Sequence, residues 1–139
     1  MDRMEAAQEV IAVSVLIVDD QPPFRQIAKT VVGISPGFAV AGEAESGEGA
    51  VALAAELRPD LVLMDINLPG INGIEATRRI TAANPDAVVV LLSTYAATDL
   101  PSDATSCGAV AYVHKEDFGP GPLRSLWDQR GDSEFGLVH

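Results

Sequence analysis

The chain has 139 residues, 47% of them apolar, and this size and composition favour one domain with a buried core over a disordered segment. Its formal net charge is −11, and no run of lysines or arginines supplies the basic face that direct nucleic-acid binding requires. No apolar stretch reaches the roughly 20 residues of a membrane span, and the acidic N-terminus does not resemble a secretory signal, so we expect a cytoplasmic protein.

Short apolar runs alternate with amphipathic stretches, beginning with Val13–Val18, which predicts a buried strand. Pro22-Pro23 then favours the start of a helix, and Phe24, Ile27, Val31 and Ile34 share the face of that helix that we expect to be buried. The same alternation continues along the chain. It predicts further strands at 38–44, 61–64, 88–92 and 111–113, and further helices at 47–57 and 74–83.

The last third of the chain has weaker helical patterns. Residues 96–107 are poor in large apolar side chains and contain Pro101, so we expect a short or irregular fourth helix there. One or two helical turns at 123–127 are followed by residues 131–139, which we expect to form a loose tail. We therefore predict an N-terminal extension over 1–12, one domain over 13–127 and a C-terminal tail over 128–139.

Five strands that alternate with helices predict an α/β fold with a single parallel sheet and right-handed crossovers. The strands are continuous apolar runs, as expected where helices cover both faces of a sheet. We therefore expect a doubly wound sheet that brings the carboxyl ends of its strands to one edge. Ligands of such sheets bind at that edge.

Polar side chains directly follow four of the predicted strands: Asp19 and Asp20, Asp65, Ser93 and Thr94, and Lys115. Three carboxylates at close range repel one another unless their pKa values rise or a cation binds between them. Oxygen ligands without clustered cysteine or histidine suit a hard ion such as Mg²⁺. With that ion in place, Asp65 could attack phosphorus and form an acyl phosphate. Lys115 and a hydroxyl from Ser93 or Thr94 would then bind the phosphoryl oxygens.

At these residues the chain resembles the receiver domains of response regulators in two-component signalling. The resemblance covers roughly residues 13–127 and rests on three segments, Val15–Asp20, Leu63–Gly73 and Gly108–Lys115. The loops are similar to those of receivers that precede a helix-turn-helix output domain. The resemblance implies a flavodoxin-like sheet with the strand order 2-1-3-4-5.

The resemblance also implies a role for each matching position. It makes Asp65 the phosphoacceptor and Lys115 the lysine that binds the phosphoryl group. Asp20 matches a direct Mg²⁺ ligand, and Asp19 matches a second acid that acts through water. Asn67 matches the position whose backbone carbonyl completes the metal site.

The hydroxyl and an aromatic residue complete the implied site. Receivers usually place the hydroxyl 22 residues before the lysine, which selects Ser93, whereas a one-residue deletion in the fourth helix would select Thr94. Tyr112 matches the aromatic switch, with a fixed core tyrosine as the alternative. Two departures from the family are Glu116, where many receivers have a proline, and Pro101, which lies in the surface that usually signals.

The resemblance implies a phosphorylation-controlled switch that catalyses only its own phosphorylation and dephosphorylation. A sensor histidine kinase or phosphotransfer protein would donate the phosphoryl group to Asp65. The change would reach a downstream protein, which the sequence does not name, through the fourth helix, the fifth strand and the last helix. A homodimer is a further option. Tyr95 lies two residues after Ser93, where it would hinder a water that attacks the phosphoryl group. We expect His114 to be a surface residue.

Three other functions are alternatives to this one. A phosphohydrolase with an aspartyl nucleophile commonly has an acid two residues after it, where Asn67 stands here. A flavin-binding protein of this topology needs a glycine- and hydroxyl-rich loop after the first strand, and Gln21-Pro22-Pro23 does not provide one. The alternative that stays open is a receiver-like interaction module that is not phosphorylated in practice.

Overall fold

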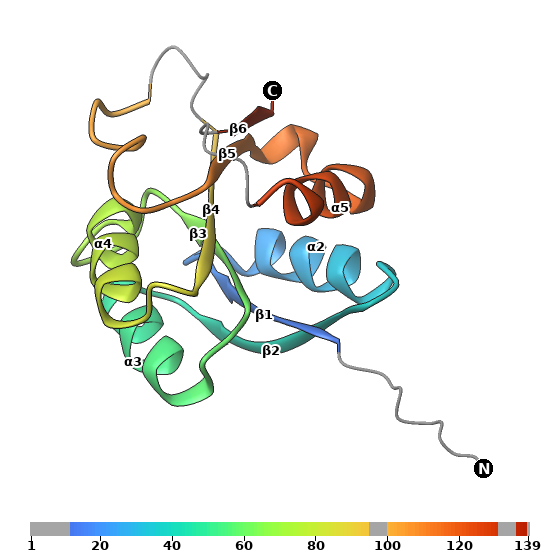
Figure 1. Cartoon of the computed structure of the whole chain (residues 1–139), viewed down its shortest axis with the longest axis horizontal. Coiled ribbons are helices and arrows are strands. Elements are labelled where there is room, and N and C mark those ends of the chain that lie inside the picture. The colour runs from blue at the N-terminus through green and yellow to red at the C-terminus, as the bar shows by residue number, and fades with distance from the viewer. Residues whose placement is uncertain (1–11, 95–99, 131–135, 139) are drawn as a thin grey trace.

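The computed structural model describes residues 12–94, 100–130 and 136–138. Within these residues the fold is a six-stranded parallel sheet in the order β2-β1-β3-β4-β5-β6 (Figure 1). Its first five strands confirm the predicted fold class and the order 2-1-3-4-5. The strands are β1 (Val13–Val18), β2 (Phe38–Ala44), β3 (Leu61–Asp65), β4 (Val88–Ser93), β5 (Ala111–His114) and β6 (Gly136–Val138).

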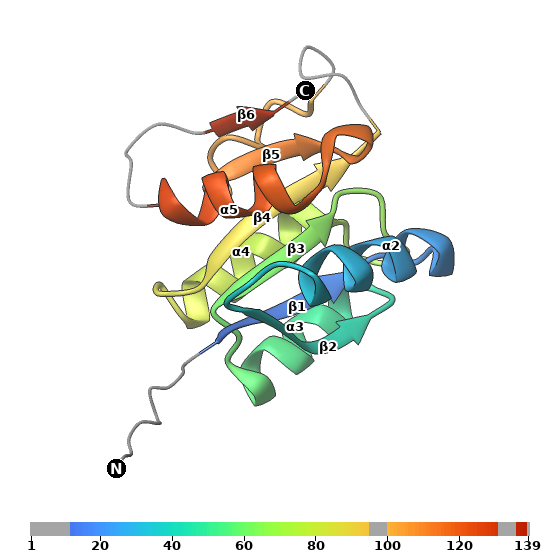
Figure 2. The same ribbon diagram turned by 90° about the vertical axis from the view of Figure 1, so that its right-hand side faces the viewer.

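Helices cover both faces of the sheet (Figure 2). α2 (Pro22–Gly33) and α5 (Pro120–Asp128) lie on one face, and α3 (Gly47–Leu57) and α4 (Gly73–Ala83) lie on the other. None of the described helices has the length and apolar character that a bilayer crossing needs.

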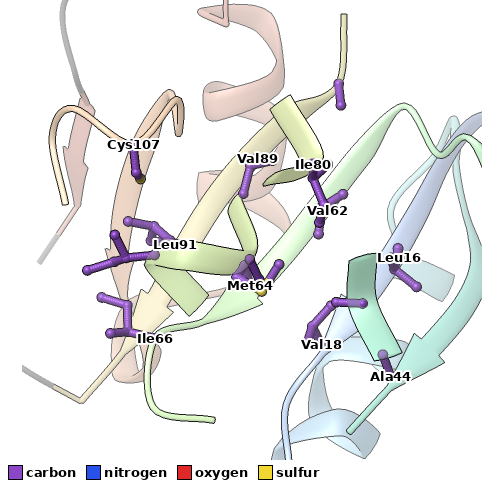
Figure 3. Packing of buried hydrophobic residues seen from close by; sticks show 14 of the residues in the cluster. Leu16, Val18, Ala44, Val62, Met64, Ile66, Ile80, Val89, Leu91 and Cys107 are labelled. Atoms are coloured by element: carbon purple, nitrogen blue, oxygen red, sulfur yellow. The ribbon is translucent and has the colours of Figure 1, made fainter. Parts of the chain in front are cut away.

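Each face of the sheet has its own core, because successive side chains of a strand point to opposite faces. Leu16 and Val18 of β1 pack on the α3–α4 side with Val62 and Met64 of β3 (Figure 3). The alternate residues of the same strands pack on the α2–α5 side, namely Val15, Ile17, Leu61 and Leu63. Burial on both faces explains why these strands are continuous apolar runs in the sequence.

α2 buries a face that only partly overlaps the one that its apolar spacing predicted, since Val31 is buried and Phe24 packs against the core as expected. Ala28, Val31 and Val32 are buried, whereas Ile27 is 52% exposed and Ile34, just after the helix, is 65% exposed. The prediction was therefore wrong for these two isoleucines. Several overlapping apolar faces fit this short helix, and its contacts with the sheet and α5 select one of them.

Residues 100–110, which lead into β5, are irregular, as Pro101 predicted. Residues 100–110 form turns and bends, with backbone N–H bonds from Ala104 to the Pro101 carbonyl and from Ser106 to the Asp103 carbonyl. Ala104 and Cys107 are buried and anchor the segment on the α3–α4 side. Residues 95–99, including Tyr95, lie outside the described residues.

β6 is a correction to the expected loose tail. Gly136–Val138 pairs in parallel with β5, with Leu137 opposite Tyr112. The steps from β3 to β4 and from β5 to β6 run in the same direction across the sheet. The helix of the first step, α4, lies on the α3 face, whereas the helix of the second, α5, lies on the opposite, α2 face. The β5–α5–β6 unit is therefore left-handed, which is the rare hand. The sequence did not predict β6, because its three residues are too few to show the alternation of a strand.

The loop after β3 is held against the start of α4 by Gly73. The Asn72 side chain caps this helix by accepting the Glu75 backbone N–H at 2.9 Å. The Gly73 N–H donates to the Ile66 carbonyl at 2.8 Å, and a Cβ on Gly73 would lie 2.0 Å from the Asp65 carbonyl oxygen. A glycine is therefore required where this helix meets the end of β3.

We predict that Gly73→Ala lowers the free energy of unfolding by roughly 1–3 kcal/mol or more, because the backbone of Asp65 must shift to admit the methyl group. Urea denaturation measures the change. Gly33→Ala is the matched control, since a Cβ there meets nothing within 4 Å, and it should be neutral or slightly stabilising. Equal stability of the two variants would contradict the prediction.

Candidate functional site

A polar pocket of about 220 Å³ opens at the carboxyl ends of the strands, which is several times the ~30 Å³ that one water molecule occupies in the liquid. The residues that line it come from the ends of β1, β3, β4 and β5: Asp20, Gln21, Asp65, Asn67, Ser93, Thr94 and Lys115. The structure thus brings together six of the eight residues expected from the sequence. The other two, Asp19 and Tyr112, are buried beside this group.

Three carboxylates converge in the site. One oxygen from each of Asp19, Asp20 and Asp65 lies within 4.8 Å of the others. Asp19 and Asp65 are buried, whereas Asp20 is exposed. Asp19 Oδ1 accepts the backbone N–H of Gln21 at 2.8 Å. Its buried Oδ2 has no conventional hydrogen-bond donor among the described residues, so it depends on a nearby cation.

Lys115 supplies that positive charge. Its Nζ atom lies 2.7 Å from Asp19 Oδ2 and 3.5 Å from Asp65 Oδ2. The ammonium also lies 4.7 Å from the centre of the Phe24 ring, which packs against Phe118 at 6.3 Å between ring centres. Phe24 therefore forms an aromatic wall that favours a cation at this place. No sequence pattern indicates this contact, because an apolar residue on a helix also fits an ordinary core position.

Burial raises the pKa of Asp65 to about 6, and repulsion from Asp19 contributes in the same direction. The Lys115 ammonium and the backbone N–H of Asn67, which lies 3.4 Å from Asp65 Oδ1, act in the opposite direction. Desolvation therefore outweighs the attraction of the Lys115 ammonium. Additional positive charge in the pocket would favour the ionised carboxylate.

The donor set fits a hard divalent cation. When all are ionised, three carboxylates and one ammonium leave an excess of two negative charges. Oxygen ligands at this spacing are those that Mg²⁺ binds, usually through one or two carboxylates while it keeps several waters. The partly open pocket beside Asp20 leaves room for such a hydrated ion.

The hydroxyl side of the pocket is formed where β4 ends. Ser93 is buried and Thr94 is exposed, and both line the pocket. The Tyr112 hydroxyl donates to the Ser93 backbone carbonyl at 3.2 Å. Burial raises the pKa of Tyr112, which keeps the phenol neutral and able to donate. Tyr112 is thus a core residue that contacts the peptide of the candidate hydroxyl residue.

Comparison with known proteins agrees with this geometry. Residues 15–125 match the family described as the response regulator receiver domain. The chain belongs to this family. The receiver is 38% identical over 104 residues to the transcriptional regulatory protein DegU of Brevibacillus brevis, covering 75% of this chain and 44% of that protein. It is also 38% identical over 103 residues to the response regulator GacA of Pseudomonas aeruginosa, covering 74% and 48%.

The receiver thus spans less than half the length of these two relatives. Among solved structures, it is similar to a LuxR-family two-component response regulator from Aurantimonas sp. SI85-9A1. That likeness has a TM-score of 0.80 and 30% sequence identity, and covers 91% of this chain and 90% of the other. The response regulator domain of Thermotoga maritima CheB has a TM-score of 0.77 at 28% identity, covering 86% and 96%.

We predict that the stability of the receiver in EDTA depends on pH through Asp65. Because the folded pKa of about 6 exceeds the ordinary 3.8, the stabilising contribution of the protonated group is complete below pH 3.8 and is lost as pH rises through 6. Asp65→Asn should therefore become more stable than the unmodified protein by about 1–3 kcal/mol between pH 4 and pH 7.5.

Urea denaturation at a series of pH values measures this difference. Mg²⁺ should reduce it at pH 7.5, since the ion stabilises the ionised carboxylate. Asp86→Asn, at an exposed acid before β4, is the control and should show no such trend. A pH-independent gain for Asp65→Asn would contradict the raised pKa.

Proposed function

We propose that this receiver accepts a phosphoryl group on Asp65 in a Mg²⁺-dependent transfer from the phosphohistidine of a histidine kinase or phosphotransfer protein. The observation that carries the proposal is the position of the Lys115 ammonium, 2.7 Å from Asp19 and 3.5 Å from Asp65, in a pocket that a strand-end hydroxyl also lines. A nucleophile, a cation and a hydroxyl donor together are the groups that phosphoryl transfer to a carboxylate requires.

In the transfer, a carboxylate oxygen of Asp65 forms a bond to phosphorus while the bond between phosphorus and the donor histidine nitrogen breaks. Mg²⁺, when bound to Asp19, Asp20, Asp65 and the Asn67 carbonyl, would supply positive charge to the phosphoryl oxygens. The Lys115 ammonium, which contacts Asp19, would move to contact one of the phosphoryl oxygens. With a pKa of about 6, part of the Asp65 population is protonated near neutral pH, and a bound cation would increase the ionised fraction that can attack phosphorus.

The link from the acceptor site to a partner would run through β4 and β5. Ser93 would donate its hydroxyl to a phosphoryl oxygen, and Tyr112, bonded to the Ser93 carbonyl, would follow that movement. The change would reach a downstream protein through residues 100–110, β5 and α5. This is a bias on a two-state equilibrium rather than a new fold.

The domain bounds, the cellular location and the catalytic scope of the chain are part of the same proposal. Residues 13–127 would form the receiver, with 1–12 as an extension and 128–139 as a tail that contributes β6. The receiver would act in the cytoplasm, and it would catalyse only its own phosphorylation and dephosphorylation. A homodimer remains one way to transmit the signal.

We predict that the unmodified protein, incubated with Mg²⁺ and acetyl phosphate, gains the mass of one phosphoryl group, whereas Asp65→Asn gains none. Intact-protein mass spectrometry makes the measurement, and EDTA should abolish the gain. No added mass on the unmodified protein would favour an interaction module that is not phosphorylated. Rapid turnover of an external phosphate ester would instead favour a phosphohydrolase.

We predict that Ser93→Ala slows this phosphorylation by about ten-fold, because a hydrogen bond to a charged oxygen is lost. Thr94→Ala should change the rate by less than about three-fold, since its side chain is exposed at the pocket rim. The same mass assay, sampled over time, gives both rates. The reverse ranking would assign the hydroxyl to Thr94.

A further inference from the structure

We propose that His114 is a positioning residue that joins the end of β4 to the loop that carries Lys115, so that the hydroxyl and the ammonium face Asp65 together. This inference deepens the proposed phosphoacceptor function and rests on it. Nothing in the sequence marks His114 for this role, because both of its partners are backbone groups.

Two hydrogen bonds define the position of the imidazole. Nε2 lies 3.0 Å from the carbonyl oxygen of Thr94, and Nδ1 lies 3.2 Å from the backbone nitrogen of Glu116. A backbone N–H can only donate, so Nδ1 must be the acceptor. A carbonyl oxygen can only accept, so Nε2 must carry the proton. The contacts therefore select one neutral tautomer of His114.

These two bonds reach the residues adjacent to the proposed phosphoryl ligands. Thr94 directly follows Ser93, and Glu116 directly follows Lys115. Tyr112, two residues earlier and therefore on the same face of β5, donates to the Ser93 carbonyl at 3.2 Å. β5 thus contacts two consecutive carbonyls at the end of β4, and the His114 ring also accepts the backbone N–H of Glu116 in the lysine loop.

Glu116 is one of the departures from the family pattern, in which a proline often follows the lysine. A proline has no N–H and could not donate to Nδ1. The ordinary structural role for His114 is to cap the short 3-10 helix η2 (Lys115–Asp117), whose Glu116 N–H it accepts. Capping explains the hydrogen bond at Nδ1, but it does not explain the contact between Nε2 and the Thr94 carbonyl.

Two substitutions separate the capping role from the positioning role. The side-chain oxygen of His114→Asn can replace Nδ1 as the cap of η2, but the shorter side chain has no atom in place of Nε2. The longer side chain of His114→Gln can return a donor to the Thr94 carbonyl. Phosphorylation by acetyl phosphate with saturating Mg²⁺ should slow about three- to ten-fold in the Asn variant and recover to within about two-fold in the Gln variant.

The tautomer gives a readout that does not depend on phosphorylation. The chain has two histidines, so the His114→Asn spectrum identifies the His114 signals in long-range ¹H–¹⁵N NMR. We expect the Nε2–H form in the unmodified protein and in Glu116→Gln, which keeps the backbone N–H. Glu116→Pro, which removes it, should show a mixture of tautomers and a slower phosphorylation.

The outcomes distinguish this inference from the function on which it rests. An unmodified protein that gains no phosphoryl mass would overturn both. An unmodified protein that is phosphorylated, together with an Asn variant of unchanged rate, would overturn only the positioning role. The Nδ1–H tautomer in the unmodified protein would also overturn it, because the bond to Thr94 could not then form.

Discussion

The ion pair between Lys115 and Asp19 is the interaction on which the site depends. Its 2.7 Å contact joins the end of β5 to the end of β1 and places the ammonium near Asp65 at the end of β3. Two buried carboxylates side by side would be costly without a positive charge, so the ion pair allows Asp19 and Asp65 to stay buried. One ammonium does not balance three ionised carboxylates, and a bound divalent cation would offset the remaining negative charge.

The order of the sheet explains how distant residues meet. β1, β3, β4 and β5 are consecutive neighbours and all run in parallel, so their carboxyl ends form one edge. Side chains pack on both faces of these strands, and the resulting burial also desolvates Asp65. The packing that forms the sheet is therefore also the main reason why the pKa of Asp65 is raised.

Much of this could be predicted from the sequence, because doubly covered strands are apolar runs and polar residues mark their ends. What escaped prediction depends on partners that only the fold supplies. Phe24 looked like a core residue until Lys115 was placed over its ring. His114 looked like a surface residue because its partners, the Thr94 carbonyl and the Glu116 N–H, carry no sequence signal. Ile27 was assigned to the wrong face, since short helices offer several apolar stripes.

The sixth strand changes what the β5 side of the sheet offers to another protein. With β6 paired along Ala111–Val113, β5 is an interior strand, and its backbone groups are not a free row for a foreign strand to join. A foreign strand could pair with β5 only after β6 is displaced, and otherwise meets the outer edge of β6. A covered edge also protects the strand that carries Tyr112 from the sheet-to-sheet association that leads to aggregation.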